Sequence, residues 1–99
     1  MVAVNYLQSL ADAVRRELPD AELPKDEAES LLLLYGLLVA LKGVEVTDED
    51  VHDAWTAWKT LLGADHGSMV PFDQLDDDTR ASDAPFTEAI RRAAASASK

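Results

Sequence analysis

The sequence has no cysteine, few aromatic side chains and a shortage of positive charge. Without cysteine the chain cannot form a disulfide framework, a thiol nucleophile or a thiolate metal site. Nine lysines and arginines stand against nineteen acidic residues, which gives a formal net charge of −10. Because this charge repels phosphates and anionic lipid headgroups, we expect neither a nucleic-acid partner nor a membrane partner.

Long hydrophobic runs are also missing. The longest mostly apolar stretch, Leu31 to Leu41, is about half as long as the roughly twenty residues that a membrane-spanning helix needs. The N-terminal sequence lacks the basic and apolar regions of a signal peptide. Together with the lack of cysteine, these features predict a cytoplasmic protein.

The residues that are present suffice for one small globular domain. Hydrophobic residues make up 47% of the 99 residues, which supports a single modest core. Apolar side chains recur at the three- and four-residue spacing of one helix face in several segments. We therefore expect an all-α fold, a compact single-domain bundle of about four helices over residues 1–99, with a short irregular loop after the third helix. The predicted helices cover approximately residues 4–18, 26–42, 47–63 and 83–93.

Residues 1–46 are expected to form a helical pair whose second, leucine-rich helix is buried. Residues 31–41 are apolar on every side, which is typical of a helix in the middle of a bundle or under an oligomer interface. The central position is favoured, and a homodimer through this helix is the alternative. Gly36 within the run indicates a close contact with another helix. Residues 94–99, rich in alanine and serine, are expected to fray.

Helix-capping residues mark the starts of the later helices. Thr47 and Asp50 resemble a capping box at the start of the third helix. Asp76 is expected to cap one short helical turn, and Asp83 is expected to be the N-cap of the last helix.

Catalytic and metal-binding patterns are not found. The two histidines, His52 and His66, lie far apart in the chain, and the serines lack the GxSxG arrangement of an activated nucleophile. The acidic triplet at residues 76–78 lacks the alternating ligands and the glycine of a calcium loop. The sequence therefore predicts a protein that is not an enzyme and has no metal ligands or cofactor.

A candidate ligand site lies in the segment 51–75, which holds both tryptophans and both histidines. At helical spacing, His52 and Lys59 lie at the edge of the apolar face of the third predicted helix, on the side nearest Trp55. An imidazole, an ammonium group and an indole therefore share one face. Such a face can stack a planar ring and hold an anionic group beside it. The tentative ligand-binding residues are therefore His52, Trp55, Lys59 and His66.

Ordinary structural roles are the alternative for several of these residues. Lys59 can be a solvated surface residue, and His66 can be a loop residue with local hydrogen bonds. The segment 70–72 is expected to return an apolar anchor to the body of the domain. The predicted core and anchor residues are Trp58, Val70, Pro71 and Phe72.

From about residue 50 onward the chain resembles the RyR domain, a repeat of ryanodine receptors that also occurs in stand-alone bacterial and phage proteins. The matching residues are His52 and Trp55, Gly63, His66, Val70-Pro71-Phe72 with Leu75, and Asp83 before Phe86. The resemblance implies that residues 47–93 form an RyR-like segment that binds a nucleotide-like small molecule, in a bacterial or phage protein. The family's Gly-Trp-x-Tyr-Gly segment, which supplies aromatic surface for such ligands, is missing between Gly63 and His66.

Several functions stay open on this evidence. The favoured one is a non-enzymatic small-ligand-binding or sensing module in the cytoplasm of a bacterium or a phage-infected host. The alternative is a protein–protein interaction or assembly protein, with a homodimer through the apolar second helix as one form. A weaker hypothesis is an acidic phage protein that imitates DNA, but the carboxylates are dispersed among caps and linkers. The sequence does not identify the ligand, the partner or the biological process.

Overall fold

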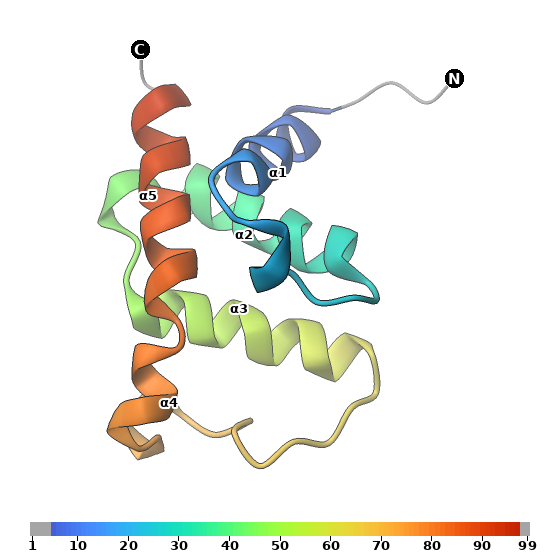
Figure 1. The fold of residues 1–99 in the computed structure, drawn as a ribbon, viewed down its shortest axis with the longest axis vertical. Helices are drawn as coiled ribbons and strands as arrows, with labels where there is room; N and C mark the ends of the chain where they lie inside the picture. The colour runs from blue at the N-terminus through green and yellow to red at the C-terminus, as the bar shows by residue number, and fades with distance from the viewer. Residues whose placement is uncertain (1–4, 98–99) are drawn as a thin grey trace.

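The computed structural model describes residues 5–97 of the chain as a bundle of helices (Figure 1). No strand occurs within these residues, so the predicted all-α single-domain fold is confirmed. Three 3-10 turns, η1 (Asp20–Glu22), η2 (Gly43–Glu45) and η3 (Phe72–Gln74), connect the helices. The α-helices of the described region are α1 (Tyr6–Arg16), α2 (Ala28–Lys42), α3 (Asp48–Leu61), the short α4 (Asp77–Ala81) and α5 (Ala84–Ala97).

The helix pair α1 and α2 forms the most extensive contact between two elements in the described region. The two backbones approach closely at Gly36, where a Cβ atom would lie 2.8 Å from the backbone nitrogen of Ala11. The same atom would lie 2.9 Å from the carbonyl oxygen of Leu7, so only glycine fits there without a shift. The close contact predicted at Gly36 is therefore present. A capping box between Asn5 and Gln8 starts α1; residue 4, the predicted start, lies outside the described residues.

The leucine-rich helix α2 is buried on one side only, which corrects the prediction that this helix is buried. Its inner face contributes Tyr35 and Gly36 to the core. Its outer face exposes Leu33, Leu37 and Leu41, which keep 42%, 37% and 69% of their surface accessible. Too few helices surround α2 to cover it: α1, α3 and α5 occupy one side within residues 5–97. Residues 31–41 are therefore apolar on every side of α2 but buried on one side only.

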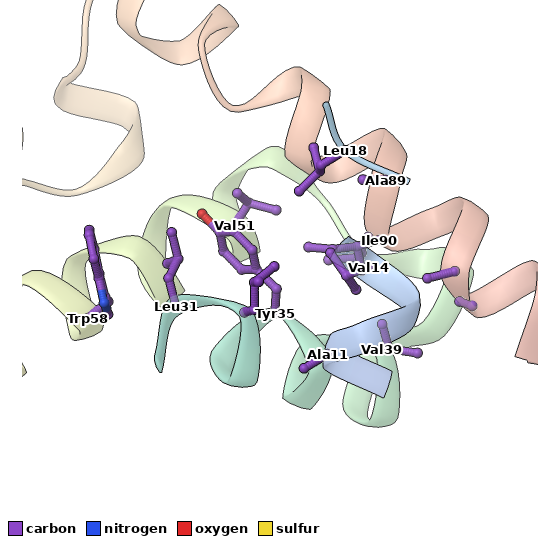
Figure 2. Close-up of a cluster of buried hydrophobic side chains, with 14 residues drawn as sticks. Ala11, Val14, Leu18, Leu31, Tyr35, Val39, Val51, Trp58, Ala89 and Ile90 are labelled. Atoms are coloured by element: carbon purple, nitrogen blue, oxygen red, sulfur yellow. The ribbon is translucent and has the colours of Figure 1, made fainter. Parts of the chain in front are cut away.

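α3 and α5 complete the core. α3 packs against α2, and α5 runs past α1, α2 and α3 (Figure 1). Thr47 and Asp50 form the predicted capping box at the start of α3, and Asp76 caps α4 by accepting a hydrogen bond from the Thr79 amide. Figure 2 shows the buried apolar side chains that these helices share, from Trp58 at one end of the cluster to Val39 toward the other.

The C-terminal helix is longer than the sequence predicts. α5 continues to Ala97, and Ala93 and Ala94 are buried against the core. The prediction that the chain frays from residue 94 is therefore wrong for residues 94–97, because alanine favours helix and buries easily in a small interface. Residues 98–99 lie outside the described residues.

Candidate functional site

A pocket of about 690 Å³ lies between the α1–α2 linker, α3, the loop after α3 and the junction of α4 with α5. Sites for small molecules commonly measure about 300–1,000 Å³. Residues 21–24 of the linker form one part of its lining, and residues 78–86 form another. The lining thus joins segments from both halves of the sequence.

Aromatic rings are packed in series along the α3 side of this pocket. The rings of His52 and Trp55, one turn apart on the helix, lie nearly parallel, with centroids 5.8 Å apart and an angle of 23°. The His66 ring from the following loop meets the Trp55 indole edge-on at 5.3 Å. The ring of Phe72 in η3 is tilted by 54° against the His52 ring, with centroids 6.1 Å apart. Helical spacing places the first pair, and the loop after α3 folds back to place the other two rings.

Lys59 brings the positive charge of the pocket. Its Nζ atom lies 5.7 Å from the centroid of the Trp55 ring and 5.2 Å from that of Trp58. Both distances are within the range of a cation–π interaction, which holds the ammonium group beside the indoles. A partly buried Lys59 can therefore offer its remaining N–H donors to an anionic or acceptor group in the pocket.

His52 is buried and is fixed by a backbone hydrogen bond. Its Nε2 atom lies 2.6 Å from the carbonyl oxygen of Val70. A carbonyl oxygen only accepts hydrogen bonds, so Nε2 carries the proton and donates it. The other ring nitrogen, Nδ1, lies 4.0 Å from the Oδ2 atom of Asp83. In the neutral imidazole Nδ1 is therefore an acceptor that faces a carboxylate.

Asp83 has the most unusual environment of the acidic residues described. Its Oδ2 atom is shielded from solvent and has no hydrogen-bond partner within residues 5–97. Burial raises the pKa of the Asp83 carboxyl to about 6; His52 acts against this shift, and the charge of Asp48 adds to it. Burial, and secondarily the charge of Asp83, also raises the pKa of the Tyr35 hydroxyl. The carboxylate thus lies in a site that stabilises its charge poorly.

The structure brings the four predicted ligand-binding residues, His52, Trp55, Lys59 and His66, to the same pocket. His66 also behaves as the predicted loop residue, because its Nδ1 accepts a hydrogen bond from the Ser68 amide at 3.0 Å. That these residues bind a ligand stays a prediction.

The predicted core and anchor residues divide into two groups. Trp58 is buried in the core cluster and also contacts the pocket. Val70 and Phe72 are half-buried, and Pro71 is exposed. The segment 70–72 therefore contacts His52 and Arg80 instead of filling the core.

Several pocket residues could not be recognised from the sequence. The sequence predicts Asp83 as a helix N-cap, and Asp83 and Phe86 also fall in the RyR pattern, but no sequence pattern assigns these two residues or Tyr35 to a pocket. The linker residues 21–24 read as a turn between two helices. No local pattern signals their role, because tertiary packing alone places them beside α3.

The described part of the chain shows neither a metal-binding cluster nor a membrane-spanning helix. Among residues 5–97, no three His, Asp or Glu side chains lie close enough together to hold a metal ion. The helices of this region are also too short or too polar to cross a bilayer.

Comparison with known protein families corrects the resemblance noted in the sequence. The model of a domain of unknown function, DUF7701, matches residues 5–95. This match includes α1 and α2, which the RyR pattern left out, and nothing supports an RyR-type repeat. The RyR assignment is therefore wrong: a His-x-x-Trp helix face followed by a Val-Pro-Phe turn also arises from ordinary helix and turn signals. No curated protein and no solved structure matches the chain.

Proposed function

The chain belongs to the DUF7701 family, and we propose that it is a non-enzymatic domain that binds a small ring-bearing molecule in the pocket beside α3. The proposal does not depend on the RyR resemblance. It rests on the His52 ring stacked on Trp55, and the His66 ring edge-on to Trp55, along a pocket of about 690 Å³.

Stacked rings favour a flat ligand. Trp55 is half-buried and not part of the fully buried core, so its indole contributes both to packing and to the pocket lining. Aromatic side chains bind flat apolar surfaces with little loss of conformational freedom, since they have few rotatable bonds. A planar ring placed against Trp55 would join the ring cluster that Trp55 forms with His52 and His66.

Polar groups converge on the same space. Lys59 supplies donors at the indole side, and Asp83 supplies an acceptor at the junction of α4 and α5. An apolar cavity with a few fixed polar groups is the usual form of a small-molecule site. The arrangement supports binding better than catalysis, because no activated nucleophile is found in the residues that line the pocket.

The proposal is tested by a thermal-shift and calorimetric screen with nucleosides, nucleotides and other planar heterocycles. We expect at least one compound to raise the melting temperature and to bind with a stoichiometry of one. Trp55→Ala should abolish that binding while circular dichroism shows an intact fold. Leu61→Ala, which removes an exposed side chain of the same helix outside the pocket, should leave it unchanged. Binding that survives Trp55→Ala would refute the proposed site.

A second candidate function, self-association, is supported by the exposed face of α2. Leu33, Leu37 and Leu41 recur every four residues and form one apolar ridge. The occupant that fits is a second copy in antiparallel orientation. The acidic end of one ridge, near Glu29, would then meet the basic end of the other, near Lys42, and the helix dipoles would oppose each other.

Light scattering over a range of concentrations tests the self-association. We expect a concentration-dependent dimer that Leu37→Glu abolishes. Leu61→Glu, at an exposed position of α3, is the matched control and should dimerise normally. A strictly monomeric wild type at high concentration would eliminate this candidate.

A further inference from the structure

The contact between His52 and Asp83 is too long for a hydrogen bond. The Nδ1 atom of His52 and the Oδ2 atom of Asp83 lie 4.0 Å apart, and both are acceptors when His52 is neutral and Asp83 is ionised. At this distance the two atoms form no hydrogen bond, and the Nε2 proton of His52 is donated to the Val70 carbonyl. Within residues 5–97 no other group donates to Oδ2. A buried acceptor without a donor costs free energy, so a donor brought by a ligand would be favoured.

The charges around Asp83 favour a cationic donor over a neutral or anionic one. The pocket is lined by three carboxylates, those of Glu22, Asp78 and Asp83, and by the single ammonium group of Lys59 among the lysines and arginines described. Asp48 on α3 adds negative potential next to Asp83. The net charge of −10 also attracts cations to the molecule as a whole.

The other groups around Asp83 within residues 5–97 give its Oδ2 atom no hydrogen bond. From α2, the Tyr35 hydroxyl faces the carboxylate and remains protonated. From α3, the carboxylate of Asp48 accepts a hydrogen bond from the Thr87 hydroxyl and keeps its negative charge close by. His52, also on α3, favours the ionised carboxylate, but its Nδ1 atom lies 4.0 Å from Oδ2, too far for a hydrogen bond. The groups that face Asp83 thus leave a negative site at one end of an aromatic pocket.

We propose that the pocket selects planar nitrogen cations, such as amidines and protonated aminoheterocycles, through a hydrogen bond from the ligand to the Asp83 carboxylate while its ring stacks on Trp55. This inference rests on the proposed function and narrows it to a ligand class. An amidinium group is planar and presents two parallel N–H donors, which is the geometry that a carboxylate accepts best. A phosphate-bearing ligand would instead have to enter beside three carboxylates.

The ligand class is tested with three molecules of almost identical shape: benzamidine, benzamide and benzoate, which are cationic, neutral and anionic. Both tryptophans of the chain line the pocket, so the two indole N–H signals in an ¹H–¹⁵N NMR spectrum report on it directly. We expect benzamidine to shift the Trp55 signal with an affinity at least about tenfold higher than benzamide, since a charge-assisted hydrogen bond is stronger than a neutral one. Benzoate should bind most weakly.

The variant Asp83→Asn keeps the shape of the side chain and removes its charge. It should reduce benzamidine affinity to that of benzamide, about tenfold or more. Asp53→Asn changes the net charge equally at an exposed position outside the pocket and should leave benzamidine affinity unchanged. Benzamidine should also bind more tightly at pH 7.5 than at pH 5, because the Asp83 carboxyl is protonated below its pKa of about 6.

The outcomes separate this inference from the proposed function. Equal binding of all three probes, or benzamidine binding that Asp83→Asn does not weaken, would refute the cation selectivity while the pocket stays a ring-binding site. Tighter binding of benzoate would show that Lys59 sets the preference and would also refute it. If none of the three probes shifts either indole signal, the inference fails, and the wider screen under the proposed function then decides whether the pocket binds any ring.

Discussion

The indole nitrogen of Trp58 donates to the backbone carbonyl of Glu27, at 3.1 Å, across the interface between α3 and the start of α2. Glu27 has left-handed backbone angles (φ 61°) and immediately precedes α2. The same indole N–H lies 3.1 Å from the Ser30 hydroxyl, which itself donates to the Glu27 carbonyl. The buried Trp58 side chain thus stabilises the turn at which α2 begins.

Trp58→Phe should destabilise the domain by about 1–2 kcal/mol, because it removes the part-buried hydrogen bond to the Glu27 carbonyl and part of the buried indole. Chemical denaturation measures this loss. Trp55→Phe is the matched control, since the Trp55 indole nitrogen donates no hydrogen bond within residues 5–97, and it should cost clearly less. Equal losses for the two variants would show that the hydrogen bonds to the α2 start do not contribute.

Glu27→Gly should stabilise the domain or leave it unchanged, despite the usual cost of glycine. A left-handed conformation costs a non-glycine residue about 1 kcal/mol, which glycine avoids. Glu45→Gly, at another exposed turn glutamate without a positive φ angle, should destabilise it. Thermal unfolding of the two variants decides whether the strain at Glu27 is present in solution.

Gly36→Ala should destabilise the domain by about 1–3 kcal/mol, because the added methyl group would overlap the backbone of α1 and push the helices apart. Gly67→Ala is the control, because a Cβ atom there meets nothing within 4 Å. The denaturation midpoint should fall for the first variant and stay nearly constant for the second. A fully stable Gly36→Ala protein would mean that α1 and α2 are less closely packed than described.

The stability of the protein should depend on pH through Asp83. Its pKa rises from an ordinary value of 3.8 in the unfolded chain to about 6 in the fold, so the folded state retains a proton that the unfolded state loses. This contribution is present below pH 3.8 and is lost as the pH rises through about 6. Asp83→Asn should therefore stabilise the domain at pH 7.5 by about 1 kcal/mol, after allowance for solvent at the pocket.

The same variant should give little gain at pH 4.5, where Asp83 of the wild type is protonated in the fold. Thermal unfolding of both proteins at several pH values measures the difference. Asp78→Asn, an exposed carboxylate of the same pocket, serves as the control and should show no such pH-dependent gain. A constant difference between Asp83→Asn and the wild type at every pH would contradict the raised pKa.

The helices and the caps of α3 and α4 could be predicted from the sequence because both depend on short-range chemistry. Thr47 with Asp50, and Asp76 with Thr79, lie three residues apart, so their hydrogen bonds follow from local spacing. The predicted start of α2, at residue 26, is two residues before the observed start at Ala28, because nothing local signals the left-handed angles of Glu27.

The pocket could be predicted only in part. His52, Trp55 and Lys59 share a helix, so their common face follows from helical periodicity. Asp83 lines the same pocket although it lies about thirty residues after His52 in the chain. The α1–α2 linker lines it too, although it precedes His52 by a similar number of residues. Such long-range placement depends on how α5 and α1 pack, which no local pattern encodes.

The pocket draws its walls from the linker between the first two helices and from segments on either side of α4. A molecule bound there would contact parts of the chain that separate when the domain unfolds. Its binding free energy would therefore be added to the unfolding free energy, by about 2.7 kcal/mol at a ligand concentration one hundred times the Kd. In a marginally stable domain of this size, the ligand concentration would then control how much folded protein escapes proteolysis, so occupancy could be read out as abundance.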